Sequence, residues 1–229
     1  MQNNFFISAP EPIISADTSN DFYFGYFSLK NKYTKLPGPN VNMSFSKKKS
    51  SDTYTTSSFG TALFGFPEKG FTKIYLEKKR TVGTTFYGQS SVRKYYGQGN
   101  FKNFFLSFSI PVSFGKFEIG NTNKDNLSFY NILLGVSESA GYATQKKSFL
   151  LQMSSNIKVI SGYNEKYEGG EYYSNMKSGV INPFFAAKIE TAAQYIPNSL
   201  NLIVFYESYF ASSENDKMEM LSANISFKF

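Results

Sequence analysis

Cysteine, histidine and tryptophan are absent from this 229-residue chain. Without cysteine there is no disulfide framework, no thiolate metal site and no cysteine nucleophile. Without histidine the Ser-His-Asp and Cys-His catalytic devices are excluded, and so are histidine metal sites. The sequence also shows no phosphate-binding glycine loop and no nucleophile elbow. We therefore expect a protein that is not an enzyme and that carries neither a cofactor nor a metal.

Long apolar runs are also missing. No stretch of 18 apolar residues occurs, so no transmembrane helix is expected. The first residues lack the basic start and apolar core of a secretory signal, which predicts the mature form of an exported protein, without its signal peptide. Charged residues are scarce at 18%, whereas Phe (25) and Tyr (17) are abundant. This composition favours many β-strands over a helical bundle.

The clearest pattern lies at the end of the chain, where LSANISFKF alternates strictly between apolar and polar residues. In a strand, every apolar side chain of this stretch would face the same side. A strand with one face toward lipid and the other toward water has this pattern. The apolar members of the stretch are Leu221, Ala223, Ile225, Phe227 and Phe229.

This ending resembles the C-terminal strand of bacterial outer-membrane β-barrels. In that family a terminal Phe, preceded by apolar residues at every second position, is the assembly signal read by the barrel-assembly machinery. The resemblance covers nine residues and implies an all-β fold: a single closed antiparallel up-and-down transmembrane β-barrel, porin-like or of the small surface-antigen type. It also implies a bacterial outer-membrane location, with the lipid bilayer, lipopolysaccharide and the assembly machinery as partners.

The same alternation recurs at Phe104–Val112 and Phe149–Val159, and the whole chain predicts about ten strands, with eight to twelve open. Residues 21–229 are expected to form the barrel. Residues 1–20 are expected to be a lead-in, favoured on length, or a short plug. A strand is predicted at Phe71–Lys79, and Arg80–Asn100 reads either as one long loop or as two short strands. Breaks between strands are predicted at Asn31–Asn40, Ser113–Asn126, Glu138–Lys147 and Asn164–Ser178.

The net charge of +7 bears on what the barrel could do. On the predicted registers a polar face lines the lumen. An excess of Lys there predicts a narrow passive channel for small, anionic solutes. Two alternatives stay open: a surface-exposed structural, adhesion or antigen barrel whose loops bind a partner, and a soluble β-sandwich binding module. Nucleic acid is not expected as a partner, and the oligomeric state is open. The candidate lumen-lining residues are Asn156, Lys158, Lys188, Asn224, Ser226 and Lys228; the candidate interfacial tyrosines are Tyr23, Tyr26, Tyr75, Tyr206 and Tyr209.

Overall fold

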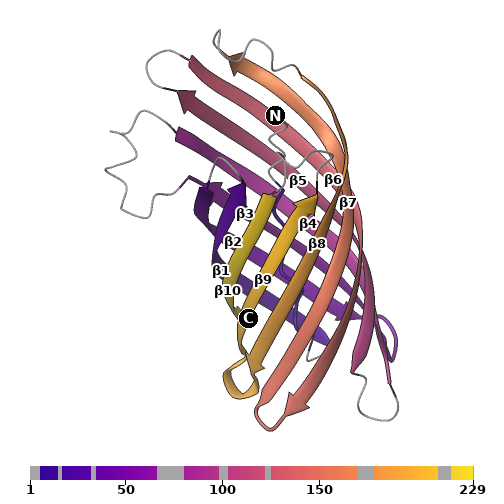
Figure 1. Cartoon of the computed structure of the whole chain (residues 1–229). Coiled ribbons are helices and arrows are strands. Elements are labelled where there is room, and N and C mark those ends of the chain that lie inside the picture. Colours follow the sequence, from indigo (N-terminus) through magenta and orange to yellow (C-terminus); the bar gives the residue numbers. More distant parts are fainter. Residues whose placement is uncertain are drawn as a thin grey trace.

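Ten antiparallel strands close into one barrel, in which each strand pairs with its sequence neighbours and β1 pairs with β10 (Figure 1). The computed structural model describes residues 6–14, 17–31, 35–65, 80–97, 103–121, 125–169, 178–210 and 218–228. Closure pairs the edges that an open sheet would expose. The strands are β1 (Thr18–Asn31), β2 (Lys35–Lys48), β3 (Thr53–Phe64), β4 (Arg80–Tyr96), β5 (Phe104–Asn121), β6 (Asp125–Lys146), β7 (Phe149–Gly169), β8 (Gly179–Tyr195), β9 (Leu200–Phe210) and β10 (Met218–Lys228).

The predicted fold class and strand number are thereby confirmed, and the β-sandwich alternative is wrong because the sheet closes on itself. One short 3-10 helix, Ile196–Asn198, joins β8 to β9. Within the part of the chain that the structure describes, no helix is long and apolar enough to cross a bilayer.

The barrel has two different ends. The turn end carries the connections β2–β3, β4–β5, β6–β7 and β8–β9, together with the end of β10. The opposite, loop end carries the other connections, and β5 to β8 rise farthest there (Figure 1). If β10 has the orientation of the C-terminal strand in the family that it resembles, the turn end faces the periplasm.

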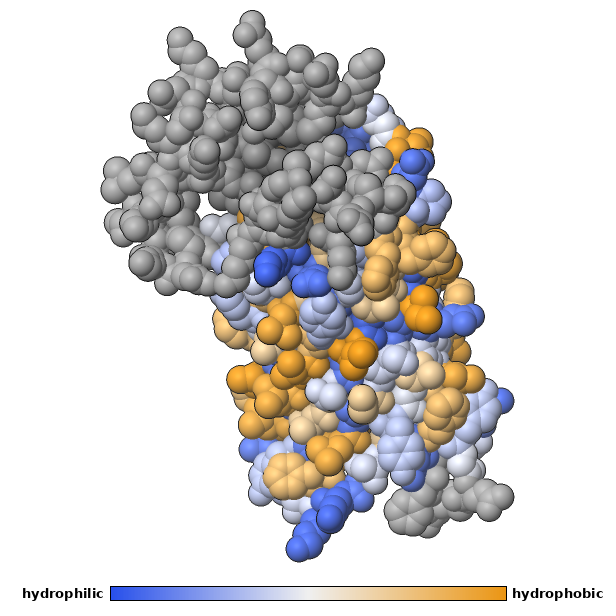
Figure 2. Space-filling model, viewed as in Figure 1, coloured by the Kyte–Doolittle hydropathy of each residue, from blue (hydrophilic) through white to orange (hydrophobic). Residues whose placement is uncertain are grey.

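Side chains alternate between the outside and the inside of the barrel along most of each strand. On β5 the outward positions Phe104, Leu106, Phe108, Ile110 and Val112 are all exposed, while Ser107 and Ser109 between them are buried. Apolar side chains of this kind cover much of the outer wall (Figure 2). The outer wall is thus an apolar belt, as a lipid-facing surface requires.

The loop predicted at Asn31–Asn40 is wrong from Lys35 onward, because β2 runs through Pro37, Gly38 and Pro39. This stretch pairs with β1, whereas the ladder between β2 and β3 extends only from Asn40 to Lys48. A proline has no N–H group and is tolerated where one side of the strand is unpaired. Both prolines lie beyond the β2–β3 ladder, where Pro37 only accepts a hydrogen bond, of 3.1 Å from the Gly65 N–H group, and no N–H donor is needed from either proline.

Three further stretches are continuous strand, two of them predicted as breaks and one as either a long loop or two short strands. Arg80–Tyr96 is one strand, β4; β5 continues to Asn121; and β6 continues to Lys146 before a turn of two residues. Polar residues near the barrel ends weaken the alternation in these stretches, but pairing on both sides keeps them extended. The predicted break at Asn164–Ser178 starts too early, because β7 extends to Gly169. The strand predicted at Phe71–Lys79 lies outside the described residues.

Gly25 lies where β1 closes against β10. A Cβ atom at this position would overlap the side chain of Asn224. We expect Gly25→Ala to lower the free energy of unfolding by about 1–3 kcal/mol through overpacking, measured by urea unfolding in lipid vesicles. The matched control is Gly88→Ala, where the nearest atom to the new Cβ would be the Ser58 carbonyl oxygen at 3.3 Å. Equal losses in both variants would contradict the close packing described for Gly25.

Candidate functional site

Residues 6–14 run through the interior of the barrel, and every one of them from Phe6 to Ile13 is buried. Phe6 packs in the apolar cluster that includes Phe27 and Met220, toward the loop end, and Ile13 packs against Tyr23 and Ile203, toward the turn end. An extended segment of nine residues spans roughly 30 Å, about the thickness of a bilayer core. Residues 6–14, here called the plug segment, thus fill the lumen along its axis. Of the two alternatives for residues 1–20, this placement corresponds to the plug.

Arg93 anchors the plug segment to β4. Its Nη2 atom lies 2.5 Å from Glu11 Oε2, and its Nη1 atom donates a hydrogen bond of 2.9 Å to the Pro12 carbonyl oxygen. Both side chains of this ion pair are 1% exposed. The guanidinium also lies over the Phe105 ring, 4.3 Å from its centroid. Such a contact adds cation–π attraction to the ion pair.

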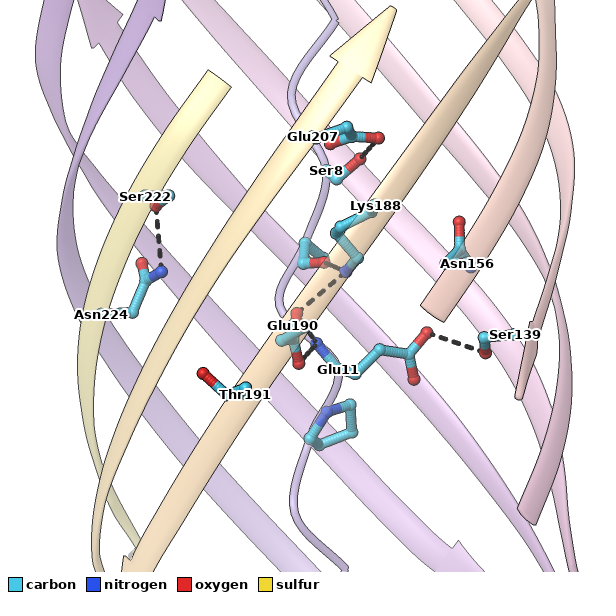
Figure 3. Close-up of polar contacts among 12 residues, drawn as sticks. Ser8, Glu11, Ser139, Asn156, Lys188, Glu190, Thr191, Glu207, Ser222 and Asn224 are labelled. Carbon is cyan, nitrogen blue, oxygen red and sulfur yellow. Dashed lines mark hydrogen bonds and ion pairs between the residues drawn. The ribbon is translucent and has the colours of Figure 1, made fainter. Parts of the chain in front are cut away.

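Lys158 of β7 and Glu207 of β9 form a second buried ion pair, with 2.5 Å between Nζ and Oε1. Ser8 of the plug segment joins this pair: its hydroxyl donates to Glu207 Oε1 at 2.9 Å and accepts from Lys158. Figure 3 shows Ser8 pointing at Glu207. The plug segment therefore contacts both members of the pair.

A third ion pair, 3.0 Å between Lys188 Nζ and Glu190 Oε2, holds the backbone of the plug segment. Lys188 donates to the Ala9 carbonyl oxygen at 3.1 Å, and the Glu11 N–H donates to Glu190 Oε1 at 2.9 Å (Figure 3). Nearer the loop end, the Tyr209 hydroxyl donates to the Phe6 carbonyl oxygen at 3.0 Å. The wall thus binds an extended peptide chiefly through its backbone groups.

The charges of this network balance only when the plug segment is in place. To this network the barrel wall contributes three buried cations, Arg93, Lys158 and Lys188, and two buried carboxylates, Glu190 and Glu207. The wall's other buried carboxylate, Asp21, accepts hydrogen bonds from Ser19 and Asn201 and is not part of the network. Glu11 supplies the third carboxylate. A buried charge without a partner is strongly destabilising, so the network favours the occupied lumen.

The structure places the candidate lumen-lining residues as follows. Asn156, Lys158, Lys188, Asn224 and Ser226 are buried and point inward, and Lys228 is half-buried on the inward side of β10. Of these candidates, only Lys158 and Lys188 join the charged network. Asn156 donates to Ser137, Asn224 accepts from Asn40, and Ser226 accepts from Asn201. The other candidates therefore belong to separate polar contacts along the wall.

Sequence reasoning missed four members of the network. Arg93 lies in the stretch that read as a loop or a strand pair, so its inward orientation could not be read. Glu11 lies in a segment without periodicity. The other two did carry a signal: Glu190 is two residues after Lys188 and shares its face, and Glu207 is two residues after Phe205 on the inward face of β9.

Of the five residues of the C-terminal signal, Leu221, Ile225 and Phe227 are exposed on the outer wall. Ala223 faces the same way, and Phe229 lies outside the described residues. The alternation therefore places the apolar side of the motif toward lipid, as expected.

Among the candidate interfacial tyrosines, Tyr26 and Tyr206 are exposed on the outer wall, but Tyr23 and Tyr209 are buried inside. The prediction was wrong for these two because each is an odd number of residues from its outward neighbour on the same strand, so it faces the opposite way. Tyr75 lies outside the described residues.

No protein-family model matches the sequence, and no curated protein matches it. Solved structures do. The β-domain of the Bordetella autotransporter BrkA has a TM-score of 0.57 at 8% identity, covering 93% of this chain and 100% of that one. The outer-membrane protease OmpT from Escherichia coli has a TM-score of 0.55 at 7% identity, with 93% and 96% covered. This chain has the fold of a bacterial outer-membrane β-barrel.

The translocator domain of the autotransporter NalP from Neisseria meningitidis is a further similar structure, with a TM-score of 0.52 at 8% identity over 93% of this chain and 87% of that one. At such low identity the likeness shows the fold alone. The closed barrel and its apolar outer wall agree with the outer-membrane location that the C-terminal motif implies.

Proposed function

We propose that this outer-membrane barrel is a channel for small anionic solutes that the plug segment holds closed. The observation that carries the proposal is the charge balance of the lumen. Around the plug segment the wall has three buried cations against two carboxylates, and Glu11 makes the numbers equal; the wall's other buried carboxylate, Asp21, lies near the turn end, paired in register with Lys228. Withdrawal of the plug segment leaves a positive excess at the centre of the lumen, which attracts anions and repels cations.

The size of the barrel supports a narrow path. Eight strands leave an interior that side chains fill, whereas the barrels of 16 or more strands enclose wide channels. A barrel of ten strands is close in size to the eight-stranded barrels that side chains fill. One extended peptide is therefore enough to fill its lumen. A channel of this kind is gated rather than permanently open, and its function involves no catalytic step.

Planar-bilayer recording tests the proposal. We expect the whole chain to be closed most of the time. A variant lacking residues 1–14 should give a steady conductance, with a reversal potential in a salt gradient that shows anion preference. A shift in mobility between unheated and heated gel samples would confirm that the shortened barrel is folded. A folded but silent barrel, or one that prefers cations, would contradict the proposal.

A second candidate function is suggested by the height of the wall formed by β5 to β8. A strand needs about 9–11 residues to cross the membrane, but β6 has 22 and β7 has 21. This wall therefore extends beyond the bilayer at the loop end (Figure 1). We propose that it presents the loop end as a binding surface, with lipopolysaccharide as its neighbour. Loss of partner binding after protease treatment of intact cells, with the barrel itself intact, would support this role.

A further inference from the structure

Glu138 is an acidic residue on the outer wall, in the middle of β6. Its side chain is exposed, and the next outward residues on the same strand are Val136 and Ala140. Its cross-strand neighbours are Phe108 on β5 and Ile157 on β7, which are also exposed on the outer wall. The carboxylate is therefore surrounded by apolar side chains that face lipid.

The depth of Glu138 can be judged from Tyr142, an exposed aromatic residue four positions nearer the turn end of β6. Four residues of a tilted strand rise by roughly 10 Å. Among the described residues, outward lysines lie near the strand ends, as Lys47, Lys94 and Lys146 do, or far from Glu138, as Lys116 does opposite Tyr130 of β6. A carboxylate so far inside the belt is costly, and such residues usually mark a functional contact with an opposite charge.

Two polar residues lead from Glu138 across the otherwise apolar outer wall to a hollow lined by residues of β6 to β9. Ser155 on β7, diagonal to Glu138, and Thr191 on β8, diagonal to Ser155, are both exposed on the outer face. Thr191 borders a hollow of about 350 Å³ in the outer wall, whose other lining residues include Met153, Leu202 and Val204. A polar stripe with an adjoining apolar hollow can receive a cation and an apolar side chain together.

We propose that Glu138, Ser155 and Thr191 form a docking site in the membrane plane for another membrane protein that presents a lysine or arginine. Charge complementarity supports this partner, because an ion pair removes the cost of leaving Glu138 alone in lipid. A second copy of this chain is a poorer fit: in the part of the barrel that the structure describes, the outward lysines lie near the strand ends or, for Lys116, opposite Tyr130 of β6, and not at the depth of Glu138. This inference is independent of whether the lumen conducts.

Because the chain has no cysteine, a spin label attached through a thiol reacts only at a cysteine introduced for the test. Ser155→Cys carries a nitroxide at the proposed site, and Ser90→Cys carries one on the outer face of β4 as a matched control. The accessibility of the label to oxygen is measured in native outer membranes, with the protein at its natural expression level. It is also measured in phosphatidylcholine bilayers that contain the labelled protein and no other protein. We expect the label at position 155 to be several-fold less accessible in native membranes, and equally accessible in both when Glu138→Gln is added. The label at position 90 should not change.

Four outcomes would overturn the proposal. Equal accessibility at position 155 in both membranes means that nothing covers the site. Loss of accessibility in pure bilayers at high protein density identifies a second copy as the occupant. Loss of accessibility in phosphatidylethanolamine bilayers that contain no other protein, but not in phosphatidylcholine bilayers, identifies a lipid amine as the occupant of the site instead of a protein. Coverage that persists in Glu138→Gln would show that the carboxylate is not what the partner recognises.

Discussion

Glu11→Gln is expected to open the barrel. The substitution keeps the shape of the side chain but leaves Arg93, 1% exposed and bound to Glu11 at 2.5 Å, without its counter-charge. Removing one partner of a buried ion pair costs about 3–5 kcal/mol. If that cost falls on docking of the plug segment, the open fraction rises on the order of 10²–10⁴-fold. Single-channel recording measures the open fraction directly.

The control is Glu165→Gln, which removes the same charge from an exposed position on β7 and should leave gating unchanged. The double variant Glu11→Leu with Arg93→Met replaces both charges by apolar groups of similar volume. It should stay closed more often than Glu11→Gln alone, because no buried charge is left unpaired. An unchanged open fraction in Glu11→Gln would show that the ion pair does not hold the plug segment.

Ile225→Lys is expected to block formation of the closed barrel. Ile225 lies on the outer face of β10, 45% exposed, between Phe24 on β1 and Leu202 on β9. A lysine facing lipid costs about 2–4 kcal/mol near the bilayer midplane. This change also disrupts the apolar alternation of the C-terminal signal. We expect little folded protein in the outer membrane, measured as the fraction of the chain whose gel mobility shifts on heating.

The matched control for this variant adds the same charge at the turn end. Ser148→Lys lies in the exposed turn between β6 and β7, where water solvates the new charge. Its effect on stability should stay within about 0.5 kcal/mol. Equal folded yields of Ile225→Lys and Ser148→Lys would contradict a lipid-facing position for Ile225.

The barrel itself could be predicted from the sequence because lipid imposes one simple rule on every strand. Outward residues must be apolar across the belt, so the alternation at Phe104–Val112 and Leu221–Phe229 identified both the strands and their lipid-facing sides. The rule weakens beyond the belt, where either side may be polar. β6 was expected to end near Glu138 for a different reason: this outward carboxylate interrupts the apolar pattern inside the belt, although the strand continues to Lys146.

The functional site was harder to predict because its parts follow no common pattern. Lys158 and Lys188 could be placed in the lumen from alternation alone. Their partners come from other strands, such as Glu207, and from a segment without secondary structure that supplies Ser8 and Glu11. Such a segment is held by individual hydrogen bonds and ion pairs, and these appear only once the barrel closes around it.

The occupied lumen is the central claim, and thiol protection at position 8 tests it most directly. Ser8→Cys changes one atom of a residue that is 2% exposed, in a chain without other cysteines. In the folded barrel in lipid, a charged methanethiosulfonate reagent should react at least a hundredfold more slowly than with the exposed control Ser148→Cys. The reaction should become fast when Glu11→Gln is added. Reaction at the same rate as Ser148→Cys without that change would mean that residues 6–14 do not occupy the lumen.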